Sequence, residues 1–260
     1  MIENDQQVKV YLSTKQIDDG SGRYGKKLLR VVKLLANEYS FVDNQTYPRP
    51  SHPIEEKRKD AFVTLVSIII SLRTTLENEV RATTKFFSKY KNIDDIISAE
   101  ENEMESLIRC AGMPKQKVNT IKNIAWFIKE KFNGDINNAK MPTIEETRNA
   151  ILSISGIGPK TADCLLELGF DMPSMVVDVN VFRVVSRLTN QEWAAKLDFQ
   201  NEKQVKQIKE LLDNNIEKDY LLCQIAHTLL LVHGKNVCNS KRHCKRCIIS
   251  NECDYAEKGC

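Results

Sequence analysis

Four cysteines near the C-terminus have the spacing of a metal-binding loop. Cys238, Cys244, Cys247 and Cys253 are separated by gaps of five, two and five residues. Structural zinc sites built from four cysteines usually pair two close-spaced C-x-x-C knuckles, and only Cys244 and Cys247 form one here. A single loop around a cubane fits the spacing better, because all four thiolates must converge on one small body. The spacing therefore predicts a 4Fe-4S cluster, with a zinc site as the alternative.

The same loop is strongly basic. No acidic residue occurs between Lys235 and Asn251. A cationic loop of this kind can dock on a phosphate backbone. The alternative is a basic turn that is simply solvated. The residues that carry the charge are Lys235, Lys241, Arg242, Lys245 and Arg246.

A second segment with the pattern of a binding site runs from Leu152 to Ala162 and reads LSISGIGPKTA. It predicts a helix, a tight turn and a second helix. Gly156 and Gly158 would let the backbone reach positive φ and approach a ligand closely, while Ile157 packs inward. Pro159 suits the first position of the second helix, where no N–H is needed. The exposed amides of such a helix start can bind phosphate, although an ordinary helical hairpin is the alternative.

Lys160 and Asp178 are the side chains that could take part in catalysis. Lys160 falls in the first turn of the second helix, where the helix dipole disfavours an ammonium and favours a neutral amine. A neutral amine can attack a sugar carbon. The alternative is a solvated surface lysine. Asp178, eighteen residues further on, stands where an N-cap would accept backbone N–H bonds.

The elements that must position these residues are helical. Apolar residues repeat at helical intervals from Leu28 to Leu35 and from Val118 to Ile128. The segment from Met175 to Leu188 is rich in β-branched residues, yet its valines also follow helical spacing. An apolar fraction of 42% and a charged fraction of 28% are typical of a globular protein and exclude a disordered tail or a fibre. The net charge of +3 indicates little about partners.

Nothing in the sequence predicts export or membrane insertion. Residues 1–24 are polar, lack the apolar segment of a secretory signal and are expected to form a flexible leader. The longest apolar stretch, from Ala61 to Leu72, is too short to span a bilayer and predicts a buried helix. We therefore expect a cytoplasmic protein, in which eight cysteines favour metal ligation or buried thiols over disulfides.

Three motifs together resemble the endonuclease III family of helix-hairpin-helix DNA glycosylases. They are the hairpin from Ser155 to Ala162, the run from Val176 to Val184 (VVDVNVFRV) and the C-terminal cysteine loop. Their order and separation match the family as well as their content does. The similarity extends from about Tyr24 onward, so the leader before it has no counterpart.

The resemblance implies an all-α fold of two helical domains with the DNA cleft between them. A six-helix, barrel-like domain with the helix-hairpin-helix would span residues 54–172. The cluster-bearing domain would combine residues 25–53 and 173–260. The family carries a 4Fe-4S cluster, which would be held by the four cysteines of the C-terminal loop.

The resemblance also implies an activity. Lys160 matches the family's nucleophile and Asp178 the carboxylate opposite it. The expected enzyme removes damaged, by default oxidised, pyrimidines from double-stranded DNA and nicks abasic sites by β-elimination through a lysine Schiff base. We expect a monomer that works on the nucleoid of a prokaryotic cell. The alternatives are a monofunctional glycosylase for thymine or uracil opposite guanine, and a non-catalytic iron–sulfur DNA-binding protein.

Arg73 and Met113 match the two positions at which the family fills the gap left by the flipped base. The sequence departs from the common bacterial pattern at both, where glutamine and leucine are usual, and its first cysteine gap is five residues instead of six. The DNA contacts expected in full are Gly156, Ile157, Gly158, Thr161, Arg73, Met113, Lys241, Arg242, Lys245 and Arg246.

Overall fold

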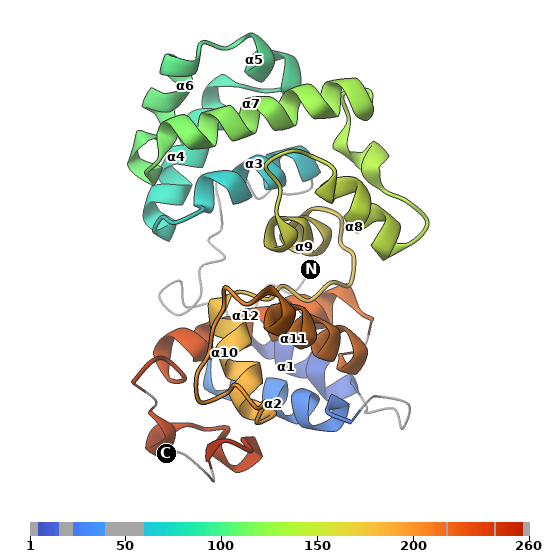
Figure 1. Ribbon diagram of the computed structural model, residues 1–260, viewed down its shortest axis with the longest axis vertical. Helices are drawn as coiled ribbons and strands as arrows, with labels where there is room; N and C mark the ends of the chain where they lie inside the picture. Colours follow the sequence, from blue (N-terminus) through green and yellow to red (C-terminus); the bar gives the residue numbers. More distant parts are fainter. Residues whose placement is uncertain (1–4, 16–22, 40–59, 217, 242, 257–260) are drawn as a thin grey trace. The chain divides into compact units, whose positions relative to one another are not determined.

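The computed structural model describes residues 5–15, 23–39, 60–216, 218–241 and 243–256. Every regular element within these ranges is helical and none is a strand, which confirms the all-α prediction (Figure 1). The chain divides into two compact units. Unit 1 is Met1–Arg49 with Pro173–Cys260, and unit 2 is Pro50–Met172. The domain boundaries expected from the sequence stay predictions, and the one near residue 54 lies outside the described residues.

Unit 2 holds the hairpin and the long helix α7. Its elements are α3 (Ala61–Ser71), α4 (Leu76–Lys89), α5 (Ile93–Ser98), α6 (Glu101–Ile108), η2 (Arg109–Ala111), α7 (Pro114–Lys131), η3 (Ile136–Ala139), α8 (Ile144–Leu152) and α9 (Pro159–Gly169). The described residues thus contain one α-helix more than the six expected. Between α5 and α6 the chain leaves the helical conformation only at Ala99, the C-cap of α5, and Glu100, the N-cap of α6.

The core of unit 2 is one apolar cluster that every α-helix of the unit enters. Helix α3 is buried on most of its surface, as its apolar stretch predicts, and its N-terminus is capped by Asp60, whose carboxylate accepts the amides of Phe62 and Val63. Helix α3 packs against α9 and α7, and α8 packs against α9. The hairpin therefore rests on a rigid helical base.

Unit 1 contains Asp178 and the cysteine loop. Its elements are α1 (Asp5–Thr14), α2 (Gly25–Glu38), α10 (Val179–Leu188), α11 (Glu202–Asn215), α12 (Tyr220–Asn236), η4 (Cys244–Arg246) and η5 (Ser250–Glu252). Helices α10 and α12 pack closely. They can do so because residue 234 is glycine: a Cβ there would lie 2.7 Å from Cβ of Asn180. The helical prediction for the valine-rich segment is confirmed from Val179 onward.

The leader differs from its prediction. A flexible segment was expected over residues 1–24, but α1 is a helix within it. Val8 and Leu12 are buried in the core of unit 1. The hydroxyl of Tyr11 donates to the carboxylate of Asp219 at 2.6 Å. The prediction is wrong for this helix because two apolar residues four apart form a docking face that the polar composition conceals.

Among the described residues, no helix is both long enough and apolar enough to cross a membrane.

Candidate active site and cysteine loop

The hairpin forms between α8 and α9 as the sequence predicts. Ile154 and Ile157 are both buried in the core of unit 2, and the amide of Ile157 donates to the carbonyl of Ile154 at 3.1 Å. These contacts hold the turn against its own helices. Pro159 is the first residue of α9, as predicted. The turn is therefore a fixed feature of unit 2.

The two glycines of the turn have different roles. Gly156 has a φ of 92°, the left-handed conformation that the sequence predicts. Gly158 was expected to share it, but its φ is −93° and it serves as the extended N-cap of α9. A Cβ at Gly158 would meet no atom within 4 Å. Glycine at position 158 thus leaves the surface above the helix start open, and it does not serve to permit an unusual φ.

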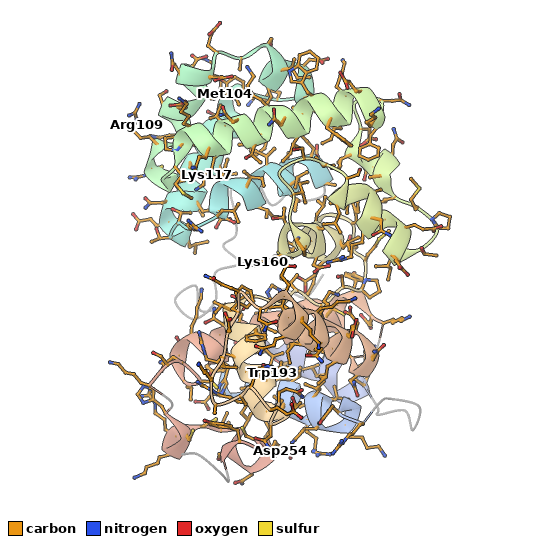
Figure 2. The ribbon with its side chains drawn as sticks, viewed as in Figure 1. Met104, Arg109, Lys117, Lys160, Trp193 and Asp254 are labelled. Atoms are coloured by element: carbon orange, nitrogen blue, oxygen red, sulfur yellow. The ribbon has the colours of Figure 1, made fainter. Side chains whose placement is uncertain are left out.

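The start of α9 leaves backbone amides without a side-chain cap. Gly158 has no side chain to accept them, and the first helical hydrogen bond runs from Ala162 to the carbonyl of Gly158. Lys160 is exposed in this first turn (Figure 2). Ile157 and Thr161 are buried, so any DNA contact they make would come from their backbone amides. This end of α9 can accept an anion while presenting an amine to it.

Asp178 is the N-cap of α10, as the sequence predicts. Its Oδ1 accepts the amides of Asn180 at 2.9 Å and Val181 at 2.8 Å. Its Oδ2 accepts the side-chain amide of Asn180 at 2.9 Å. The residue is buried, with 7% of its surface exposed. These donors fix the orientation of the carboxylate, so its negative charge has a defined place in unit 1.

Helix α10 links this carboxylate to the cysteine loop through two arginines. Arg183 Nη1 donates to the side-chain oxygen of Asn180 at 3.3 Å and to the carbonyl of Cys238 at 3.4 Å. One turn later, Arg187 Nη1 donates to the carbonyl of Cys238 at 3.2 Å and to its Sγ at 3.3 Å. The first cysteine of the loop is therefore anchored to the helix that Asp178 caps.

The four predicted ligand cysteines line one cavity in unit 1, together with Arg187 and His233. Cys238, Cys247 and Cys253 are free thiols, and burial raises the pKa of Cys247 and of Cys253. Cys244 is disulfide-bonded and would have to be reduced before it could bind a metal. A buried thiol with a raised pKa is a weak nucleophile, but it ligates once a metal displaces its proton.

Two observations test whether these residues fit an iron–sulfur cluster. The buried Nε of Arg187 has no hydrogen-bond partner among the described residues, so it could donate to an anionic group in the cavity. No three described histidine, cysteine or acidic side chains are placed to share a single metal ion. A zinc site would need each sulfur at about 2.3 Å from one ion. A cubane carries one thiolate on each of its four irons, and the four cysteines line one cavity as such a body would require.

His233 completes the wall of this cavity. It is fully buried, and burial lowers its pKa to about 4, so the ring is neutral at pH 7. Its Nδ1 lies 3.0 Å from the hydroxyl of Tyr39 and its Nε2 lies 3.5 Å from Sγ of Cys247. A neutral imidazole held in this way has one N–H to offer either neighbour.

The remaining predicted DNA contacts are surface residues where they are described. Lys241, Lys245 and Arg246 are exposed on the loop, while Arg242 lies outside the described residues. Arg73 is exposed after α3, and Met113 is 38% exposed before α7. These side chains are thus exposed to solvent; three of them belong to unit 1 and two to unit 2.

Sequence reasoning missed four residues that support these sites: Asn180, Arg187, His233 and Lys117. The position of Asn180, two residues after an N-cap, was a local signal that could have revealed it. The partners of the other three come from distant parts of the chain. Lys117 is the clearest example, because it is buried and bonds to a carbonyl 47 residues away.

Comparison with known proteins identifies the family of this chain. The model of the HhH-GPD superfamily of base excision DNA repair proteins matches residues 66–212. Endonuclease III of Thermotoga maritima is 28% identical over 204 residues, covering 78% of this chain and 87% of the relative. Endonuclease III of Sulfolobus acidocaldarius is 30% identical over 203 residues, covering 76% and 84%. The solved structure of a thermostable thymine-DNA glycosylase superposes with a TM-score of 0.68 at 24% identity, covering 90% and 98%.

The family match spans more than half of the chain and contains both the hairpin and Asp178. The helical fold agrees with it. Base excision repair glycosylases act on DNA, so the surfaces described above belong to a DNA-binding enzyme. The chain is therefore a DNA glycosylase of the HhH-GPD superfamily and belongs to its endonuclease III family.

Proposed function

We propose that this enzyme removes oxidised pyrimidines from double-stranded DNA and then cleaves the abasic strand by β-elimination, with Lys160 as nucleophile. The observation that carries the proposal is the exposed Lys160 in the uncapped first turn of α9. The free amides there bind a phosphate of the backbone. The amine beside them then lies within reach of the sugar that the phosphate joins.

The damaged nucleotide must leave the stack before Lys160 can reach it. The Nζ of the neutral amine attacks C1′, the glycosidic bond breaks, and its electron pair leaves with the base. Asp178 stabilises the positive charge that develops on the sugar, because its carboxylate is already oriented by Asn180 and Val181. The resulting amino sugar loses a proton from its nitrogen, and the C1′–O4′ bond then breaks with O4′ taking a proton, which gives an iminium at C1′. Loss of a proton from C2′ of this iminium expels the 3′ phosphate and nicks the strand.

A 4Fe-4S cluster would be held by Cys238, Cys244, Cys247 and Cys253, whose side chains line one cavity. It would supply a structural cross-link for the loop. Arg187 would donate to the cluster sulfurs from α10. Lys241, Lys245 and Arg246 would then present a fixed cationic surface to a second phosphate group.

The test is borohydride trapping on a duplex that carries one thymine glycol. The wild-type enzyme should give a covalent protein–DNA adduct, and Lys160→Ala should give none. Lys115→Ala is the matched control, since Lys115 is also an exposed lysine directly after the proline that begins a helix. It should leave the adduct intact.

Other outcomes distinguish the alternatives. Base release without an adduct would favour a monofunctional glycosylase, and duplexes with uracil or thymine opposite guanine would then replace thymine glycol. The shared fold of the thymine-DNA glycosylase does not choose between them, because 24% identity establishes the fold alone. Tight binding without base release on any of these duplexes would overturn the enzymatic proposal.

A further inference from the structure

Lys117 is a buried lysine that joins two distant segments of unit 2. It belongs to α7, and only 3% of its surface is exposed (Figure 2). Its Nζ donates to the carbonyl of Ile70 at 2.7 Å and to the carbonyl of Ala111 at 2.8 Å. Both of these residues are themselves buried. One ammonium thus holds two backbone segments at a fixed distance from each other.

Each of the two segments leads directly into a loop with a predicted DNA contact. Ile70 stands one residue before the end of α3, and Arg73 follows that end. Ala111 ends η2, and Met113 precedes the first residue of α7. The lysine therefore binds the base of both loops, immediately before the side chains that would enter the DNA.

Both loops have a backbone conformation that needs support. Arg73 has a φ of 54° and Met113 a φ of 49°, in the left-handed region that non-glycine residues seldom adopt. Such residues persist only where the surrounding structure fixes them. Lys117 holds the carbonyl three residues before Arg73 and the carbonyl two residues before Met113. The two loops thus share both their conformation and their anchor.

Apolar packing alone does not explain the choice of lysine. A buried amine loses hydration, and burial lowers the pKa of Lys117. A methionine would fill the same space without that cost, but it would leave the carbonyls of Ile70 and Ala111 without this donor. A charged donor with two acceptors gives something that apolar packing does not, namely a fixed separation between two chain segments.

We propose that Lys117 is a positioning residue that holds the Arg73 and Met113 loops at the separation needed to fill the gap left by a flipped nucleotide. This inference rests on the proposed function, because it assumes that both side chains enter damaged DNA. One lysine would thus fix the conformation of both loops. The two hydrogen bonds keep both loops in their binding conformation before DNA binds.

The experiment compares Lys117→Met with Lys117→Arg in the full chain. Lys122→Met is the matched control, because Lys122 lies on the same helix and its Nζ also donates to a carbonyl, that of Ala99 at 2.6 Å, away from both loops. The probes are a duplex with one tetrahydrofuran abasic analogue and the same duplex undamaged. The readout is the ratio of the two dissociation constants, which a general loss of stability would not change.

We expect Lys117→Met to reduce the preference for the abasic duplex about tenfold, the effect of about 1.4 kcal/mol. Lys117→Arg should restore part of the preference, and Lys122→Met should keep all of it. Hydrogen exchange of the amides at 72–75 and 111–114 should accelerate in Lys117→Met alone. An unchanged preference together with unchanged exchange would overturn the proposal.

Failure of the proposed function gives a different result. A wild-type protein that does not prefer the abasic duplex would contradict gap filling for every variant. Amide hydrogen exchange at the two loops would still decide whether Lys117 fixes them. Faster exchange in Lys117→Met would support this role of Lys117, and unchanged exchange would reject it.

Discussion

The carboxylate of Asp178 has two oxygens with different partners. Oδ1 accepts two backbone amides at the start of α10, which is the structural role of an N-cap. Oδ2 accepts only the side-chain amide of Asn180 among the hydrogen bonds of the described residues. The cap needs an acceptor but no charge. Stabilisation of a positive sugar needs the charge, so substitution can separate the two roles.

Asp178→Asn should keep the cap and lose the catalysis. Asparagine caps helices about as well as aspartate, so Asp178→Asn should lose less of the free energy of unfolding than Asp178→Ala, which should lose about 1 kcal/mol. Base release should fall about a hundredfold or more in both variants, because the charge is absent. Urea unfolding and single-turnover kinetics measure the two quantities. Wild-type base release by Asp178→Asn would leave Asp178 as a helix cap only.

The helices could be predicted from the sequence wherever the spacing of apolar residues was a clearer signal than the residue composition. The valine-rich stretch that begins α10 has strand propensity, yet the helical spacing of its apolar residues is borne out from Val179 to Leu188. Val8 and Leu12 have helical spacing too, but two apolar residues in an otherwise polar segment are too few to predict a buried helix. The fold class could therefore be predicted, and the docking of α1 could not.

The candidate site was predictable only where its signals are local. Pro159 at the first position of α9 and Asp178 at the N-cap of α10 are set by neighbouring residues. Lys117 could not be found in this way, because its partner Ile70 lies 47 residues away and only the packing of α3 on α7 brings them together. Arg187 likewise acquires its role from a cysteine loop distant in sequence.

The hairpin glycines provide a test at the scale of the element. Gly158→Ala should leave stability unchanged, because its φ is −93° and a Cβ would meet no atom within 4 Å. Its added methyl group should nevertheless weaken DNA binding about tenfold, since it occupies the surface above the uncapped amides. Gly156→Ala should lose about 2 kcal/mol of stability, because its φ is 92° and a Cβ would lie 3.1 Å from Cγ2 of Thr120.

Urea unfolding and titration of an abasic duplex distinguish these two effects. Wild-type affinity in a stably folded Gly158→Ala would show that no phosphate approaches the start of α9. A stable Gly156→Ala would show that the turn can adopt another conformation.

At the scale of the whole molecule, each unit has a core of its own. The apolar cluster of unit 2 draws on α3 to α9, and the cluster of unit 1 draws on α1, α2 and α10 to α12. Three of the four predicted ligand cysteines, Cys238, Cys247 and Cys253, pack against the core of unit 1, and none of the four packs against that of unit 2. The stabilisation that a bound cluster brings should therefore be confined to unit 1.

Removal of the cluster should loosen one unit and spare the other. We expect the protein, loaded anaerobically with iron, sulfide and a thiol reductant, to bind about four irons per chain. Oxidative loss of a cluster bound there would remove its cross-link between the end of α12 and the C-terminal loop. Amides of α10 and α12 should then exchange more than about tenfold faster, because metal-binding energy adds to folding energy in the unit that holds the ligands. Amides of α7 act as the internal reference and should not change. Equal acceleration in α7 would mean that the two cores unfold together, and one zinc per chain in place of iron would reject the cluster itself.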